Sequence, residues 1–233
     1  MCSSDLGGSI LIPAFAVDRT EVILVQLREL MEAGKIPRVP VYADSPMALR
    51  ALAFYRQAIN ESSPEIRAEI IEKWKNKDPF STGTLVELTT VDESKTINDP
   101  QQPCIIISAS GMGTGGRVVH HLRNMLPKAK HTVILVGYQA IGTRGRNLVE
   151  GATEVKMHGE MVPVRAEIES IQSFSVHADG DELIAWMNTE SEAPGQVLVV
   201  HGEAGVAETF SDRIKSQLGW KSHAPHDGEI VRL

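Results

Sequence analysis

Short apolar runs alternate with amphipathic stretches along most of this sequence, and that alternation constrains the fold more than any other feature. Five runs are rich in β-branched residues and bounded by Pro, Gly or Asp, which is typical of buried strands. They are Ser9 to Phe15, Val39 to Ala43, Leu85 to Thr90, Cys104 to Ala109 and His131 to Gly137. Because amphipathic stretches separate most of these runs, we predict an α/β fold, a Rossmann-like parallel sheet with helices on both faces.

The predicted helices have recognisable start and stop signals. Arg19 to Ala33 carries one apolar face and is followed by Gly34, a residue favoured just past a helix end. Pro46 to Asn60 and Pro64 to Asn76 both begin with proline, which is favoured in the first helical turn. Arg117 to Leu126 is the fourth predicted helix of this region.

The pattern changes after Gly151. Thr153 to Met157 and Val162 to Ile168 flank the turn His158-Gly159-Glu160, which predicts a hairpin. The following elements are a helix from Gly180 to Asn188, a strand from Gln196 to Val200, a helix from Gly205 to Leu218 and a strand from Glu229 to Leu233. We predict a domain boundary near Ser173, which gives domains of residues 7–172 and 173–233.

The composition excludes several classes of protein. The chain has 233 residues, 42% hydrophobic and 23% charged, a globular profile that rules out disorder and fibrous repeats. No apolar run reaches the roughly 18 residues of a membrane span, so we expect no membrane partner. Cys2 and Cys104 cannot form a disulfide framework and predict a cytoplasmic location. Met1 to Leu6 shows no signal-peptide pattern, and we expect the fold to begin at Gly7.

Charge is distributed unevenly along the chain. Residues 173–233 hold ten acidic and four basic side chains, whereas the remainder is close to neutral and the whole chain carries −7. An acidic segment that also contains histidines is compatible with bound cations. A well-solvated surface explains the same composition.

A glycine-rich segment, Gly111 to Gly116, satisfies G-x-G-x-x-G between a predicted strand and a predicted helix. A dinucleotide site also requires an acidic residue at the end of the next strand, and Val133 to Gln139 offers none. Free N–H groups at a helix N-terminus suit other phosphates, including those of nucleic acid. Glycines that permit a tight turn are an equally good interpretation. Arg144 and Arg146 lie in a nearby turn, where their side chains could contact phosphate. Charges that are simply solvated at a loop are the alternative interpretation.

Two histidines are the main candidates for chemistry. His177 precedes the helix predicted at Gly180, and His201 ends a buried strand-like run. A neutral imidazole is a common zinc ligand and an effective general acid or base near neutral pH. A purely structural hydrogen bond is the alternative for each residue alone.

The other polar candidates receive a structural interpretation. Asp44 or Ser45 is a natural N-cap for the helix that begins at Pro46. The remaining histidines are interpreted as exposed or capping residues: His120, His121, His131, His158, His223 and His226.

Taken together, these segments resemble the beta-CASP group of metallo-beta-lactamase-fold nucleases, which process RNA. The resemblance extends over nearly all of the chain from Gly7 onward. The matching stretches, in the order of the family, are Ile10 to Ala16, Tyr42 to Ala48, Ser108 to Met112, Val136 to Gln139, Gly142-Thr143, Phe174 to Asp179 and Val200 to Glu203.

The resemblance implies a role for each matched residue. His177 matches the motif B histidine, a catalytic residue beside the scissile phosphate that protonates the leaving oxygen or stabilises its charge. His201 matches motif C, a ligand to one of two zinc ions. Glu203 and Ser175 are expected to orient these histidines. The residues expected to contact RNA phosphate are Ser110, Gly111, Gly113, Arg144 and Ser175.

The sequence also departs from the family. The main zinc motif His-x-His-x-Asp-His is absent, as are the later histidine, the bridging aspartate and the motif A acid. Two histidines do not hold a dinuclear site. We therefore expect a beta-CASP domain followed by the C-terminal part of the metallo-beta-lactamase domain, inactive alone but part of a zinc-dependent ribonuclease with RNA as its partner. Endonuclease or exonuclease action and a homodimer are both left open.

Two other functions are compatible with the sequence. One is a non-catalytic RNA-binding or nucleotide-binding module of the same family, which would use the glycine-rich segment and Arg144. The other is a metallo-hydrolase that acts on small molecules. The long inserted domain argues against the second, because a lid of this size suits a polymer held in a cleft.

Overall fold

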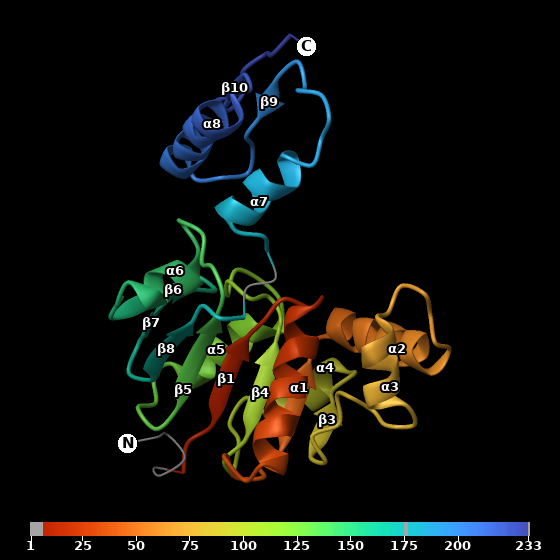
Figure 1. Ribbon diagram of the computed structural model, residues 1–233. Helices are drawn as coiled ribbons and strands as arrows, with labels where there is room; N and C mark the ends of the chain where they lie inside the picture. The colour runs from red at the N-terminus through yellow and green to blue at the C-terminus, as the bar shows by residue number, and fades with distance from the viewer. Residues whose placement is uncertain (1–6, 175–176, 233) are drawn as a thin grey trace. The chain divides into compact units, whose positions relative to one another are not determined.

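The computed structural model describes residues 7–174 and 177–232, which form two compact units divided between residues 176 and 177 (Figure 1). The predicted domain ranges, 7–172 and 173–233, stay predictions.

The first unit is built on a six-stranded sheet with the order β3-β2-β4-β1-β5-β8. Its strands are β1 (Ile10–Pro13), β2 (Val41–Asp44), β3 (Leu85–Glu87), β4 (Ile105–Ser108), β5 (Thr132–Val136) and β8 (Glu167–Ile171). All five pairings between neighbouring strands are parallel. The predicted α/β fold with a parallel sheet is therefore confirmed.

Helices cover both faces of this sheet (Figure 1). The helices of the first unit are α1 (Arg19–Glu32), α2 (Pro46–Asn60), α3 (Ala68–Trp74), α4 (Val91–Thr96), α5 (Arg117–Met125) and α6 (Arg144–Val149). Leu11 of β1 packs in one apolar cluster with Leu122 of α5, and its neighbour Ile12 packs in a second with Leu24 of α1. Successive side chains of a strand point to opposite faces, so α1 and α5 lie on opposite sides of the sheet.

The hairpin ends earlier than the sequence predicts. The structure pairs β6 (Glu154–Met157) with β7 (Glu160–Pro163), so the prediction that its second strand runs from Val162 to Ile168 is wrong. Pro163 has no N–H, and the N–H groups of Arg165 and Ala166 both donate to the carbonyl of Leu126. These contacts redirect the chain, which then joins the main sheet as β8 beside β5.

Three helices also differ from prediction. The segment from Ser63 to Ile66 forms a turn closed by the Ile66 N–H on the Ser63 carbonyl, so α3 begins at Ala68 instead of Pro64. The short helices α4 and α6 were not predicted. Thr90 caps α4 in a capping box with Glu93, and this pattern can be recognised in the sequence. The Thr143 hydroxyl caps α6 with a single hydrogen bond.

The second unit contains α7 (Gly180–Met187), β9 (Val197–Leu198), α8 (Ala204–Leu218) and β10 (Ser222–His223). β9 and β10 pair in parallel, and the buried apolar residues are Met187, Ala207 and Ile214. The closing strand predicted from Glu229 is wrong, because residues 229–232 form none. The Glu229 carboxylate instead accepts the His226 N–H at 2.9 Å and contacts the His223 ring at 2.7 Å, which folds this segment into a turn. No helix in the described ranges is long and apolar enough to cross a membrane.

Candidate functional site

A crevice opens at the carboxyl ends of the parallel strands. β1 and β4 are neighbours in the sheet but lead to helices on opposite faces, an arrangement called a topological switch point. The crevice has a volume of about 490 Å³ and is lined by residues 15–16, 44–47, 109–110 and 115–117. We call it the switch-point crevice. Ligands of open parallel sheets bind at such positions.

The glycine-rich segment forms one wall of this crevice and is held from within. Ser110 is half-buried, and its hydroxyl accepts the N–H of Thr114 at 3.2 Å. The side chain of the buried Gln139 donates to the carbonyl of Gly111 at 3.3 Å. Gly116 has φ +78, and a Cβ there would lie 2.7 Å from the carbonyl oxygen of Ala109. The glycine at this position is therefore required by the backbone.

Arg144 braces the same segment. Its guanidinium donates to the carbonyls of Gly113 at 3.0 Å, Thr114 at 3.2 Å and Lys156 at 2.7 Å. Gly113 itself has φ +64. Both interpretations of the segment thus find support: the glycines permit a tight turn, and that turn is fixed before any ligand arrives.

Two N–H groups of the segment stay available. No described residue accepts a hydrogen bond from the N–H of Gly115 or of Gly116, and both glycines line the crevice. Free N–H groups ahead of a helix attract anions. Ser110, Gly111 and Gly113 belong to this anion-compatible turn, and their predicted contact with RNA phosphate stays a prediction.

Asp44 is the centre of a buried polar network at the edge of the crevice. Its carboxylate contacts His121 Nε2 at 2.6 Å, Ser94 Oγ at 2.6 Å and an Arg117 Nη at 2.7 Å, and Asp44 is fully buried. Burial raises the pKa of this carboxyl, but the bonds from His121, Ser94 and Arg117 outweigh it and hold the pKa below its usual range. The network ties the end of β2 to α4 and α5.

The structure decides between the two candidate caps of α2 and corrects the interpretation of two histidines. Ser45, and not Asp44, caps α2, because its hydroxyl accepts the N–H of Ala48 at 3.3 Å. His121 is fully buried, so its interpretation as an exposed or capping residue is wrong. The same correction applies to His131, which is buried and whose Nδ1 accepts the Ser9 N–H at 3.0 Å. The helical spacing of Val118, Leu122 and Met125 on α5 places His121 on the same buried face and was the available signal.

The candidate catalytic residue His177 and the candidate zinc ligand His201 both lie in the second unit. His177 is exposed and precedes α7, whose N-cap is Asp179: this carboxylate accepts the N–H groups of Asp181 and Glu182 at 2.9 Å each. His201 follows β9, is exposed and has φ +67. A left-handed backbone at a non-glycine residue is uncommon and concentrates at functional turns.

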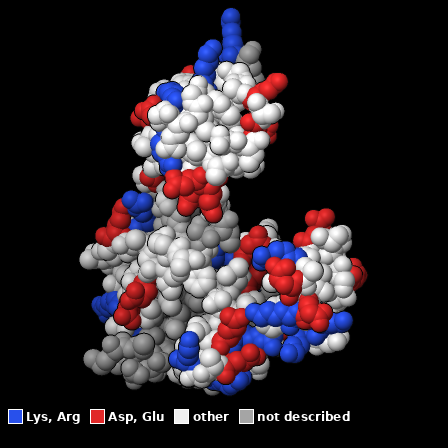
Figure 2. Space-filling view, viewed as in Figure 1, with Lys and Arg blue, Asp and Glu red and all other residues white. Residues whose placement is uncertain are grey.

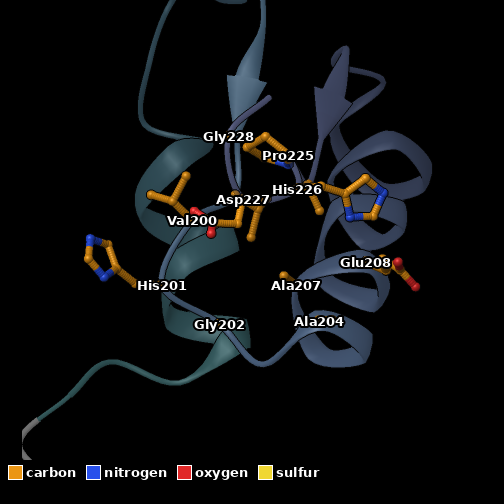
Figure 3. Close-up of a pocket in the computed structure, with 12 residues that line it drawn as sticks. Val200, His201, Gly202, Ala204, Ala207, Glu208, Pro225, His226, Asp227 and Gly228 are labelled. Atoms are coloured by element: carbon orange, nitrogen blue, oxygen red, sulfur yellow. The ribbon is translucent and has the colours of Figure 1, made fainter. Parts of the chain in front are cut away.

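His201 stands on the rim of two pockets. One, of about 400 Å³, also contains Glu208, His226 and Asp227, and the other, of about 740 Å³, contains apolar side chains that include Trp186. Figure 3 shows the rings of His201 and His226 pointing in opposite directions. Glu203 is half-buried at the N-cap of α8. Ser175, predicted to contact phosphate and to orient the histidines, lies outside the described residues.

The chemistry of the donor set tests the predicted metal centre. A zinc site takes three or four protein ligands. Among the described residues, no group of three or more His, Cys, Asp or Glu side chains is arranged to hold a metal ion. His201 is thus a single candidate ligand, and the described residues alone do not fit a zinc centre.

The fold and the crevice define the first unit as a doubly wound α/β domain with a crevice at a topological switch point. Family comparisons identify the chain further. The beta-CASP domain model matches residues 20–148, and the model of the Zn-dependent metallo-hydrolase RNA specificity domain matches residues 161–225. The chain belongs to the beta-CASP family of metallo-hydrolases, as its sequence motifs indicate.

The chain is also similar to curated relatives with names that refer to RNA or transcription. It is 36% identical over 197 residues to ribonuclease TTHA0252 of Thermus thermophilus, covering 84% of this chain and 44% of that protein. It is 35% identical to an RNase J-like protein of Methanocaldococcus jannaschii, covering 97% of this chain and 51% of that one. It is 34% identical to the transcription termination factor FttA of Thermococcus kodakarensis, covering 97% and 35%. The chain thus spans between about a third and a half of the length of these relatives.

Proposed function

We propose that this chain supplies the RNA-binding domain and part of the active site of a zinc-dependent ribonuclease that acts in RNA processing or decay. The observation that carries the proposal is the match to two family models in order along one chain, the second of which describes an RNA specificity domain. Relatives named ribonuclease and RNase J-like protein support a hydrolytic function.

In this proposal, RNA is hydrolysed at a phosphodiester bond. Water adds to phosphorus and releases one proton to solvent, the bond from phosphorus to the leaving ribose oxygen breaks, and His177 gives a proton to that oxygen. His177 then regains a proton from solvent. The exposure of His177 supports this role, because a general acid must reach its substrate. Glu203 and Ser175 are proposed to orient the two histidines.

His201 is proposed as one zinc ligand. Zinc, when bound, supplies Lewis-acid polarisation of the phosphate and a more acidic water. The remaining ligands would lie outside the described residues, since those residues contain no complete set.

RNA phosphate is proposed to bind at the switch-point crevice. Ser110, Gly111 and Gly113 form a turn that is already fixed, with the N–H groups of Gly115 and Gly116 available beside it. Arg144 is proposed to act here chiefly as a positioning residue, because its guanidinium donates to the carbonyls of the turn.

A non-catalytic RNA-binding module is the second candidate function. The observation that favours it is that residues of the first unit alone build the switch-point crevice and its fixed glycine-rich turn, without His177 or His201. Such a module would bind RNA through the glycine-rich turn and hydrolyse nothing.

We further propose a cytoplasmic location. Cys104, the single cysteine within the described ranges, is a free and buried thiol. Burial raises the pKa of this thiol, which keeps it protonated and unreactive.

His177→Ala tests the catalytic proposal. In the gene product that carries this chain, loaded with zinc, we expect cleavage of a labelled oligoribonucleotide to slow by about 10²- to 10⁴-fold, the usual contribution of a general acid. RNA affinity should be unchanged. His226→Ala, which removes another exposed histidine of the same unit, should cleave at the wild-type rate. RNA binding without cleavage in the unaltered protein would favour the non-catalytic module.

A further inference from the structure

A second pocket lies across the glycine-rich turn from the switch-point crevice. Its volume is about 690 Å³, and Gly115, Gly116 and Arg117 line both spaces. The turn is therefore a wall shared by the crevice and this pocket. We call it the α4–α5 pocket, and its polar lining includes Lys95, Asn98, Arg117, His120, Arg144 and His158.

The charge of the α4–α5 pocket is positive. Its lining contains three basic side chains and two histidines, and none of its lining residues is Asp or Glu, although the whole chain carries −7. Elsewhere the cations are compensated: over α2 and α3, Lys and Arg lie among Asp and Glu (Figure 2), with ion pairs such as Arg56–Asp78 at 3.0 Å and Lys73–Glu29 at 3.0 Å. The pocket differs from that surface in having no acidic lining residue, although Arg117 is paired at 2.7 Å with the buried Asp44 outside its lining.

Arg144 and Lys95 carry most of this uncompensated charge. The three acceptors of Arg144 are neutral carbonyls, and no ion pair among the described residues includes it. Lys95 pairs with Asp92 at 2.9 Å, but both side chains are exposed. An exposed pair of this kind contributes about 0–1 kcal/mol. Lys95 can therefore exchange Asp92 for a phosphate at small cost.

The pocket also presents a flat ring surface. His120 of α5 and His158 of the β6–β7 turn stack with ring centroids 4.8 Å apart and an interplanar angle of 26°. Partial desolvation of the ring, followed by the charges of His158, His121 and Arg123, lowers the pKa of His120 and so favours its neutral form. Both residues are exposed to solvent. Histidine rings of this kind stack on unpaired bases.

Positive charge beside stacked rings is the combination by which proteins hold single-stranded nucleic acid. We propose that the α4–α5 pocket is a nucleotide subsite for single-stranded RNA, in which a phosphate contacts Lys95 and Arg144 and a base stacks on the His120–His158 pair. The choice of RNA as the ligand rests on the proposed function. The strand would then cross the glycine-rich turn between the crevice and this pocket.

The salt dependence of binding tests the phosphate contact. We would titrate the chain into a fluorescent oligoribonucleotide at several salt concentrations and follow anisotropy. Each phosphate contact to a single strand contributes about 0.7 to the slope of log K against log salt. Lys95→Ala should weaken binding by roughly two- to fivefold and reduce that slope by about 0.7.

Lys215→Ala is the matched control, because Lys215 also pairs at 2.9 Å with an aspartate three residues before it on a helix. It should leave both the affinity and the slope unchanged. A wild-type affinity and slope for Lys95→Ala would overturn the subsite. If the unaltered chain binds no RNA, the proposed function fails instead, and this result is obtained before any variant is made.

The ring contact has its own test. His120→Ala should weaken RNA binding by about fivefold or more, the usual effect of removing one stacking platform, whereas His120→Phe keeps a ring and should retain affinity. Equal losses in both variants would contradict stacking. The last experiment measures the binding of adenosine monophosphate. If Lys95→Ala no longer binds this nucleotide but binds RNA with wild-type affinity, the pocket binds free nucleotides and the RNA subsite is overturned.

Discussion

The two units of this protein differ in how they bury polar groups. Among the described residues, every buried ionisable side chain belongs to the first unit, and the buried polar residues of the second are Ser211 and Ser222. The first unit buries its Asp44 network beside the core and fixes its glycine-rich turn, which lines the crevice, through bonds from Gln139 and Arg144. The second leaves Trp186 69% and Val206 62% exposed, and it carries the candidate catalytic residue His177 and the candidate zinc ligand His201 on its surface.

The two units therefore present two kinds of functional surface: a binding turn fixed by buried bonds, and histidines exposed to solvent. A binding turn that is fixed by buried bonds requires no reorganisation when a ligand arrives. His177 and His201 instead lie exposed on the second unit, whose buried apolar residues in the described range are Met187, Ala207 and Ile214. Three stability experiments test this contrast and complement the measurements of cleavage and RNA binding.

The largest effect is expected from Asp44→Ala. The variant leaves Arg117 and the fully buried His121 without their carboxylate partner, which typically costs about 3–5 kcal/mol. Urea unfolding should therefore show a large loss of stability in the first unit. Asp92→Ala removes an exposed carboxylate from the same region and should change stability by less than about 0.5 kcal/mol. Similar losses in both variants would show that the network is not buried as described.

A matched pair of core truncations tests whether the units unfold separately. Leu122→Ala in the first unit and Ile214→Ala in the second each empty a fully buried position, at a cost of about 2–5 kcal/mol. Each variant should shift one unfolding transition and leave the other in place. Fluorescence can follow them separately, through Trp74 in the first unit and through Trp186 and Trp220 in the second. A common shift in both transitions would contradict two independent cores.

Glu21→Gln should give a smaller effect that depends on pH. Burial of Glu21, with a contribution from the charge of Asp18, raises its pKa to about 7. The folded state thus binds this proton more tightly than the unfolded chain, so the stability it confers is present below pH 4.5 and is lost as pH rises through about 7. Above that range the variant should be more stable than the wild type, by about 3 kcal/mol.

Unfolding free energies measured at about pH 4 and about pH 8 check this expectation. The stability of Glu21→Gln relative to the wild type should increase at the higher pH and change little at the lower one. The increase should be confined to the unfolding transition of the first unit. The exposed Glu208 of the second unit offers the control, and Glu208→Gln should show no comparable dependence on pH. A gain of equal size at both pH values would mean that charge burial is not its cause.

Local signals along the chain predicted most of the secondary structure. Pro46 to Asn60 is a helix with the predicted bounds, and Gly34 lies just past the end of α1 with φ +66. These features depend on caps, on proline geometry and on apolar spacing within a few residues. The motifs from Ile10 to Glu203 also identified the family, since their order along the chain is itself part of the sequence.

Contacts between residues far apart in the sequence could not be predicted from these local signals. The contact from His121 to Asp44 joins residues 77 apart, and the α4–α5 pocket joins Lys95 to His158. The end of the hairpin at Pro163 and the return of the chain as β8 depended on two N–H groups that share the Leu126 carbonyl. None of these partners can be read from a short window of sequence.

The amino-acid sequence was sufficient to predict the alternating α/β order, the glycine-rich turn, the two candidate histidines and the family. The folded arrangement was needed to establish that Asp44 is a buried ion-pair partner, that Arg144 braces the turn, and that a positive pocket lies behind it. The reason is that periodicity and capping act between neighbours along the chain. Burial, charge compensation and pocket shape depend instead on which distant segments the sheet brings together.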